Sequence, residues 1–245
     1  MADVAEMRGY APTAKHESWT KAGPVASHMP ESAIETLEER SMATMGDSTP
    51  LGLWGFATGT WIAATVVGGL VSYGDMNAVA PIALLFAGVA QFIAGLYAYR
   101  RVNSLLANAF CCFGAFNTVL GLIVLLEAAG LIPTTQGSNL IVGFFFESFA
   151  FIAAALGLGA MRANFATVAV LVTLAVGYAL GGIPFLDGTI SHIAAGGPGG
   201  GSISIVGLIG ACFLFISSLL AYYTGAAMLV NSTWKRHVLP IFGKP

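Results

Sequence analysis

Residues 104–126 read SLLANAFCCFGAFNTVLGLIVLL and contain no charged side chain. An α-helix rises about 1.5 Å per residue, so a stretch of this length crosses the ~30 Å hydrocarbon core of a lipid bilayer. Arg100 and Arg101 stand just before it. The stretch therefore predicts a transmembrane helix with a basic N-terminal end.

The composition of the whole chain agrees with a membrane protein. Hydrophobic residues make up 56% of the sequence and charged residues 9%, and the mean hydropathy is +0.79. An average soluble domain has about 25% charged residues, so a water-soluble fold is excluded. The formal net charge is -2 and no basic run occurs, which excludes a nucleic-acid partner.

Five further stretches share this apolar, uncharged character, interrupted only by Glu147. The six predicted spans are 52–73, 77–99, 104–126, 139–161, 163–185 and 203–230. Helices satisfy their own backbone polar groups, which lipid does not do. We therefore predict an all-α integral membrane protein, a six-transmembrane-helix bundle, in a domain over residues 47–245. Residues 1–46 are expected to form a polar, partly disordered tail, with a short surface helix over residues 30–45 as the alternative.

The basic residues predict the orientation of the bundle. With six spans, all Lys and Arg residues fall on one face of the membrane. They are Arg8, Lys15, Lys21, Arg40, Arg100, Arg101, Arg162, Lys235, Arg236 and Lys244. The positive-inside rule makes that face cytoplasmic, with both termini on it.

Several polar and aromatic residues share helix faces within the spans. Phe56 and Thr60 are one turn apart, as are Phe113 and Asn117, and Gln91 lies in the second span. Such faces could line a narrow pore, with rings as the constriction and hydroxyls and amides as hydrogen-bonding groups. The alternative is that the rings fill the bundle core and the amides tie helices together.

Glu147 is the one formal charge within the predicted spans. A carboxylate at that depth is costly unless it is neutralised or faces a cavity. We weigh two roles equally: a proton site that couples solute movement to protons, and a neutral carboxyl group bonded to a neighbouring helix or subunit. The spans hold no metal-ligand spacing, phosphate loop, nucleophile elbow or dinucleotide fingerprint. No enzyme, metal site or cofactor is predicted.

Residues 47–56, DSTPLGLWGF, resemble the signature that opens the first span of the acetate uptake transporter family, the succinate-acetate permeases and their fungal relatives. The family pattern is Asn-Pro-Ala-Pro-Leu-Gly-Leu followed shortly by Phe. The agreement continues in the second and third spans and at the C-terminus, and leaves out the tail. The matching residues are Pro50, Leu51, Gly52, Leu53, Phe56, Gly88, Gln91, Ala94, Gly95, Tyr99, Asn103, Ala109, Phe110, Gly114, Phe116, Asn231, Arg236, Val238, Leu239 and Pro240.

This resemblance implies a homohexamer in the cell membrane, with a pore for acetate and related short monocarboxylates in each protomer. It implies a constriction at Phe56, Phe113 and Leu171. The chain departs from the family in three places: Asp47 and Ser48 replace Asn and Pro, and Phe113 stands where bacterial permeases have Tyr. The exact substrate and the chemistry of the entrance are therefore open.

Transport of acetate, with succinate as a further candidate, is thus the predicted function, either channel-like or coupled to protons. The spans hold no Lys or Arg, so helix N-terminal amides near Pro50 and Gly52 and side-chain donors are expected to hold the anion. An ionised Asp47 is expected to weaken anion entry. Two alternatives stay open: a channel for a small neutral solute, and a structural membrane subunit.

Overall fold

The computed structural model describes residues 30, 32–33, 36–37, 46–71, 77–133, 135–189 and 204–241. The chain divides into two compact units, Met1–Gly46 and Asp47–Pro245. In the first unit, residues 32–33 and 36–37 are helical, and the Thr36 hydroxyl donates a hydrogen bond to the Ser32 carbonyl at 2.7 Å. The rest of the predicted tail lies outside the described residues, and with it the choice between a surface helix and disorder.

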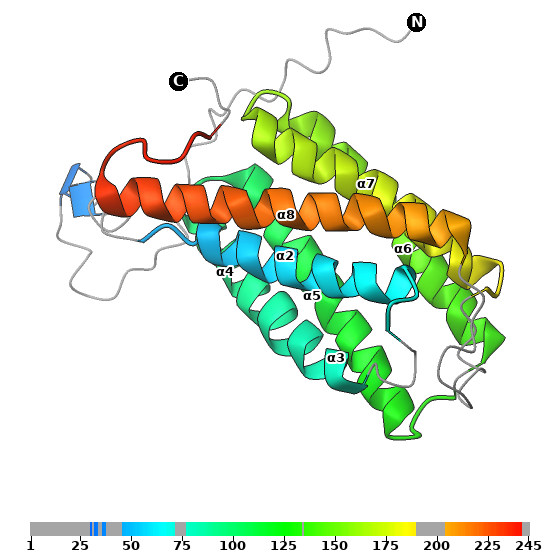
Figure 1. The fold of residues 1–245 in the computed structure, drawn as a ribbon. Helices are drawn as coiled ribbons and strands as arrows, with labels where there is room; N and C mark the ends of the chain where they lie inside the picture. The colour runs from blue at the N-terminus through cyan, green and yellow to red at the C-terminus, as the bar shows by residue number, and fades with distance from the viewer. Residues whose placement is uncertain are drawn as a thin grey trace, which may run out of the picture. The chain divides into compact units, whose positions relative to one another are not determined.

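Six helical spans make up the described part of the second unit (Figure 1). They are α2 (Thr49–Val67), the combined span of α3 (Val79–Pro81), η4 (Ile82–Ala90) and α4 (Gln91–Arg100), then α5 (Ser104–Ala128), α6 (Gln136–Ala160), α7 (Phe165–Leu186) and α8 (Ile205–Trp234). Each is long and apolar enough to cross a membrane, and the described residues contain no β-sheet. The predicted all-α, six-helix membrane fold is confirmed.

Polar side chains just before the helices fix where four of them begin. Asn103, Thr135, Asn164 and Ser204 each accept a hydrogen bond from a backbone N–H in the first turn of the following helix. Such caps satisfy amides that have no partner within the helix. Short polar connections therefore start helices that are themselves almost wholly apolar.

The spans pack as a closed set of neighbours. α6 packs on α7, α7 on α8, α8 on α2, α2 on the second span and that span on α5, while α5 also meets α2 and α6. α8 runs beside both α2 and α7 in Figure 1. Glycines allow the closest approaches: a methyl group at Gly114 would lie 2.7 Å from the Phe92 nitrogen and 3.0 Å from the Gly88 oxygen. Small residues at such positions are typical of helix packing in membranes.

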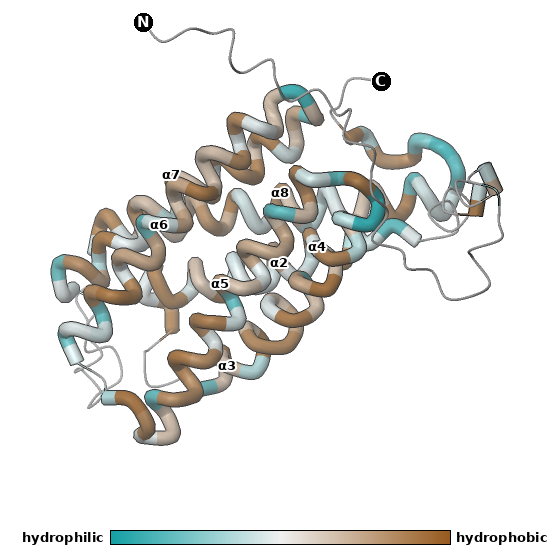
Figure 2. Tube along the Cα trace, turned by 180° about the vertical axis from the view of Figure 1, so that it is seen from behind, coloured by the Kyte–Doolittle hydropathy of each residue, from teal (hydrophilic) through white to brown (hydrophobic). Residues whose placement is uncertain are grey.

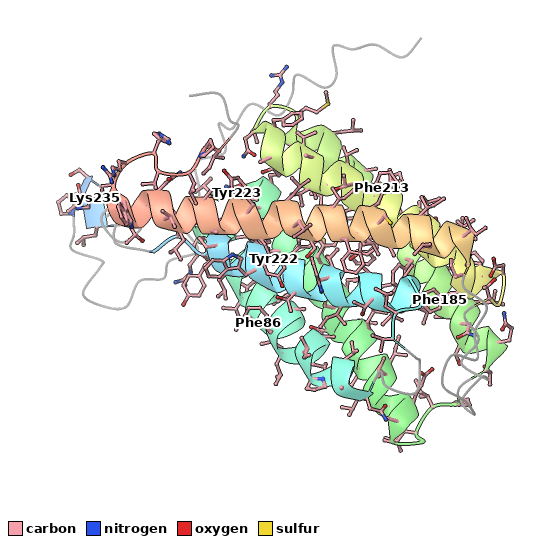
Figure 3. All side chains as sticks on the ribbon, viewed as in Figure 1. Phe86, Phe185, Phe213, Tyr222, Tyr223 and Lys235 are labelled. Atoms are coloured by element: carbon pink, nitrogen blue, oxygen red, sulfur yellow. The ribbon has the colours of Figure 1, made fainter. Side chains whose placement is uncertain are left out.

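The outer surface of the bundle is apolar, as a lipid-facing surface must be. Brown, hydrophobic segments run along the helices in Figure 2, and teal segments gather at several helix ends and connections. Large apolar side chains such as Phe144, Phe151 and Leu158 on α6 are exposed. Successive spans run in opposite directions, so Arg100, Arg101, Arg162, Lys235 and Arg236 share one end, here called the basic end. Figure 3 shows Lys235 and Phe185 at opposite ends of the bundle.

The chain folds back on α8 after the basic end is reached. The side-chain oxygen Oδ1 of Asn231 accepts hydrogen bonds from the backbone nitrogens of Val238 (2.7 Å) and Leu239 (2.9 Å), and its side-chain nitrogen Nδ2 donates to the Leu239 backbone oxygen at 2.8 Å. The Tyr223 hydroxyl donates to the Pro240 oxygen. These bonds explain why Asn231 and the Val-Leu-Pro ending occur together.

Two features differ from the sequence predictions. The glycine content of residues 182–201 predicts a loop there, but α7 continues through Pro184 to Leu186, and residues 190–203 lie outside the described residues. The second span is not a uniform α-helix, because Ile82–Ala90 is a π-helix. The Gly and Pro content of the sequence predicts neither outcome. α7 packs against α8 and the π-helix packs against α5, and this packing supports both segments.

Candidate functional site

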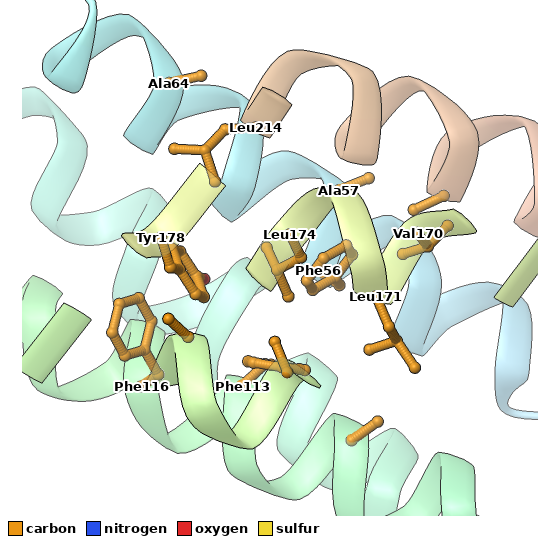
Figure 4. Close-up of a cluster of buried hydrophobic side chains, with 14 of the residues drawn as sticks. Phe56, Ala57, Ala64, Phe113, Phe116, Val170, Leu171, Leu174, Tyr178 and Leu214 are labelled. Atoms are coloured by element: carbon orange, nitrogen blue, oxygen red, sulfur yellow. The ribbon is translucent and has the colours of Figure 1, made fainter. Parts of the chain in front are cut away.

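The three residues predicted to form a constriction come together inside the bundle. Phe56 of α2, Phe113 of α5 and Leu171 of α7 are buried, and the ring centroids of Phe56 and Phe113 are 5.6 Å apart. Figure 4 shows these three side chains gathered from their three helices, with Leu174 and Tyr178 beside them. All three line one cavity of about 30 Å³, here called the near cavity because it lies toward the basic end. One water needs roughly 10–15 Å³ of such space, so the near cavity is narrow.

Of the three polar candidates, Thr60 and Asn117 lie one helical turn further from the basic end, and Gln91 lies against Gly55 of α2. Thr60, Gln91 and Asn117 are buried in α2, α4 and α5. The Asn117 amide donates to the Phe113 oxygen at 2.9 Å and to the Gln91 oxygen at 3.4 Å. The Gln91 nitrogen Nε2 is buried and has no hydrogen-bond partner among the described residues. The structure therefore places an unpaired donor next to Asn117, although Gln91 itself does not line the near cavity.

A second cavity lies on the other side of the rings and amides. This far cavity has a volume of about 60 Å³ and is lined mainly by apolar side chains. Gly59 and Asn117 form part of its wall, together with Val67, Val124 and Phe185. Phe56 and Phe113 line the near cavity, and Asn117 lines the far one. We call Phe56 and Phe113 with the neighbouring Thr60, Gln91 and Asn117 the ring layer, since it separates the two cavities.

Tyr178 of α7 belongs to this layer and was not predicted. It is 1% exposed, and its ring centroid lies 6.3 Å from that of Phe113 and 5.0 Å from that of Phe116. The family resemblance suggested that a hydroxyl is absent here because Phe113 replaces Tyr. The structure supplies one from another helix. Leu171, Leu174 and Tyr178 have i, i+3, i+7 spacing, and this signal could have identified Tyr178.

A third cavity opens at the basic end. This mouth cavity has a volume of about 160 Å³ and polar walls that include Asp47, Ser48, Arg101 and Asn103. Leu106 lines both the mouth cavity and the near cavity. The three cavities and the ring layer thus follow one another along the bundle, and we call this succession the central path.

The Thr49 and Gly52 amides at the start of α2 are already bonded within the chain, contrary to expectation. Asp47 Oδ1 accepts hydrogen bonds from the Thr49 nitrogen at 3.0 Å and the Thr49 hydroxyl at 2.7 Å, and the Gly52 nitrogen bonds the Ser48 oxygen at 3.0 Å. Pro50 has no N–H to offer. The chain's own carboxylate therefore occupies the place where a substrate carboxylate was expected.

The signature residues shape the entrance rather than bind a ligand directly. A methyl group at Gly52 would lie 2.5 Å from the Phe110 ring, so this position needs glycine for α2 and α5 to pack. Leu53 lines the near cavity, whereas Leu51 is exposed on the outside. Pro50 is in the first turn of α2, where a missing N–H costs nothing.

Glu147 lies apart from the central path. It sits in the middle of α6 with its Oε1 against α7, where a methyl group at Gly182 would come within 2.6 Å of that oxygen. Oε1 is buried without a hydrogen-bond partner among the described residues, and Glu147 lines none of the three cavities. Its role as a proton site stays a prediction.

These features define a multi-pass membrane protein with a narrow internal path, the architecture of a channel or transporter. Among the described residues, no three His, Cys, Asp or Glu side chains come together as a metal site would require. The chain belongs to the GPR1/FUN34/yaaH family, whose sequence profile matches residues 31–242. This match confirms the predicted family resemblance.

A solved structure with the same fold is described as "Structure of the bacterial acetate channel SatP". The two chains align with a TM-score of 0.68 and 23% sequence identity, over 81% of this chain and 99% of that one. No curated protein matches the chain. The likeness extends the fold assignment over nearly the whole length of the solved chain.

Proposed function

We propose that this chain carries acetate and related short monocarboxylates, succinate among the candidates, through the central path of each protomer. The observation that supports this proposal most directly is the ring layer. Two aromatic rings and Leu171 narrow the path, and the amides of Gln91 and Asn117 lie within one helical turn of it. A small carboxylate fits this arrangement, because it has an apolar end and two oxygens that accept hydrogen bonds.

The absence of a counter-charge in the ring layer favours conduction over tight binding. The side chains that form the layer are aromatic, aliphatic, amide and hydroxyl groups. A carboxylate held by neutral donors alone is bound weakly, and weak binding at successive positions suits rapid passage. The same apolar layer also admits an undissociated acid, so a neutral-solute channel is the alternative.

Location and assembly form part of the proposal. We propose that the protein lies in the cell membrane as a homohexamer, with both termini in the cytoplasm. The family membership and the clustering of described basic residues at one end support this arrangement. The exposed rings on α6, Phe144 and Phe151, offer apolar surface to lipid or to a neighbouring copy.

Uptake of radiolabelled acetate into liposomes containing the purified protein tests the proposed function. Wild type should give saturable uptake that other short carboxylates inhibit. Phe56→Ala removes a ring from the constriction, so butyrate and succinate should gain uptake relative to acetate. Phe151→Ala, which removes an equal ring from the exposed face of α6, is the control and should match wild type.

Acetate uptake no faster than into empty liposomes would reject the function. An imposed proton gradient decides the coupling mode: a channel responds only to the acetate gradient and the voltage, whereas a symporter accumulates acetate against its own gradient. Glu147→Gln should abolish that accumulation if Glu147 is the proton site. An unchanged pH profile in Glu147→Gln would remove that role.

A further inference from the structure

Arg101 and Asp47 form an ion pair in the wall of the mouth cavity. Arg101 Nη1 lies 3.1 Å from Asp47 Oδ1, and the two side chains are 38% and 37% exposed. The same Oδ1 accepts both hydrogen bonds from Thr49. One carboxylate oxygen therefore links the start of α2 to the end of α4.

The turn between α4 and α5 holds Arg101 in place. The nitrogens of Arg101, Val102 and Asn103 bond the oxygens of Tyr97, Tyr99 and Ala98 in that order. Val102 has φ 56°, a left-handed conformation that a β-branched residue rarely adopts, and its side chain is exposed. Asn103 then caps α5. Strain of this kind persists where the surroundings over-determine it, often at a functional position.

The position of Arg101 puts a guanidinium at the entry to the central path. The mouth cavity, at about 160 Å³, has room for a small carboxylate with water, and it shares Leu106 with the near cavity. Arginine presents five N–H donors, and the contact with Asp47 uses only Nη1. The remaining donors suit a carboxylate, which arginine binds with two parallel hydrogen bonds.

The strength of the ion pair decides whether a substrate can compete with Asp47. Ion pairs with this much exposure contribute little to the stability of a protein. Opening the Asp47–Arg101 pair therefore costs little, whereas opening a buried pair would leave an uncompensated charge.

We propose that Arg101 is a carboxylate-recruiting site at the mouth of the central path, and that Asp47 is a built-in competitor that occupies this site until a substrate carboxylate displaces it. The inference rests on the proposed function and adds a binding site before the ring layer. It also gives Asp47 a different role from simple repulsion. Asp47 weakens anion entry through Arg101, so its effect depends on Arg101 being present.

A double-mutant cycle on acetate uptake tests this dependence. Arg101→Gln should raise the acetate concentration for half-maximal uptake about two- to fivefold, the range expected for an exposed charge pair. Asp47→Asn keeps an oxygen for Thr49 but removes the charge, and it should lower that concentration by a similar factor. In the Arg101→Gln background, Asp47→Asn should have no effect.

Arg100→Gln is the matched control. It removes the same charge at the neighbouring residue, and the Arg100 side chain lines none of the three cavities. It should match wild type. Arg101→Lys should fall between wild type and Arg101→Gln, since it keeps the charge and loses the planar fork. High salt should narrow the difference between wild type and Arg101→Gln. Thermal unfolding in detergent confirms that each variant is folded.

Equal half-saturation for Arg101→Gln and Arg100→Gln would overturn the inference, as would an Asp47→Asn effect that persists without Arg101. Both results leave the proposed function standing, because wild type still carries acetate. If wild type carries no acetate at all, the proposed function fails and this inference fails with it.

Discussion

Gln91 combines complete burial with an unused hydrogen-bond donor. Its side chain is 0% exposed, its side-chain oxygen accepts a hydrogen bond from Asn117, and its Nε2 has no partner in the described part of the chain. Leaving a buried donor unpaired costs about 1–3 kcal/mol. We propose that this donor of the ring layer serves a passing ligand; the alternative is that the amide only ties helices together.

Replacing Gln91 by Leu should therefore separate stability from transport. We expect Gln91→Leu to unfold at the same temperature as wild type or a few degrees higher, because the unpaired donor is gone. Acetate uptake should fall roughly tenfold, since a hydrogen bond to a charged group contributes about 1.5–3 kcal/mol. Gln136→Leu, at the exposed start of α6, is the control. Parallel loss of stability and uptake in Gln91→Leu would assign the amide to the fold instead.

Some residues of the candidate site were predicted from the sequence and others were missed. The family resemblance alone predicted a constriction at Phe56, Phe113 and Leu171, and these residues line one cavity in the structure. Tyr178 and Arg101 were missed. Tyr178 lies in an apolar span at a spacing that any helical core residue could have. Arg101 was used only as one of the basic residues that predict the orientation of the bundle. Its link to Asp47 depends on a turn with positive φ at Val102, which no hydropathy pattern encodes.

At the scale of elements, the second span and α5 pack through glycines so closely that their backbones meet. The methyl group of an alanine at Gly114 would press on backbone atoms of Phe92 and Gly88, which cannot move aside as a side chain can. At Gly181 of α7 the same methyl group would find its nearest neighbours, the Val67 methyls, at 3.4 Å and 3.6 Å, an ordinary contact.

Gly114→Ala and Gly181→Ala should accordingly have opposite effects on stability. Overpacking at Gly114 should reduce the free energy of unfolding by about 1–3 kcal/mol. Gly181→Ala should be neutral or stabilising, because alanine favours a helix over glycine by about 1 kcal/mol. Thermal unfolding of both purified variants checks the pair, and equal melting temperatures would show that α5 can move away from the second span.

Element boundaries were harder to predict than the elements themselves. Hydropathy located all six spans, yet it began the first at residue 52 and ended it at 73, whereas α2 runs from Thr49 to Val67. The polar start of α2 is helical because Asp47 and Pro50 favour it, and Gly69 with φ 69° lies just beyond its end. The π-helix of the second span arises from packing against α2 and α5, which a linear pattern does not contain.

At the scale of the whole molecule, charge is distributed by membrane side. The described Lys and Arg residues gather at the basic end, and Asp187 lies at the opposite end beyond α7. The positive-inside rule predicts that the basic end faces the cytoplasm. Asp75, His192 and the basic residues of the tail lie outside the described residues.

Single introduced cysteines should reveal this orientation in intact cells. In a variant lacking Cys111, Cys112 and Cys212, we expect Gln136→Cys to react with a membrane-impermeant thiol reagent added outside. His237→Cys, at the basic end, should react only after the cells are opened. The reverse pattern would place the termini outside.

The ring layer should make the rate of passage depend strongly on temperature. A carboxylate in water is held by strong bonds to its hydration shell, and the space around Phe56, Phe113 and Leu171 leaves room for only a few of those waters. Gln91, Asn117 and Thr60 replace part of what is lost, but not all of it. If the proposed function holds, permeation begins with an enthalpic barrier of dehydration, and the rate of carboxylate uptake should rise steeply with temperature.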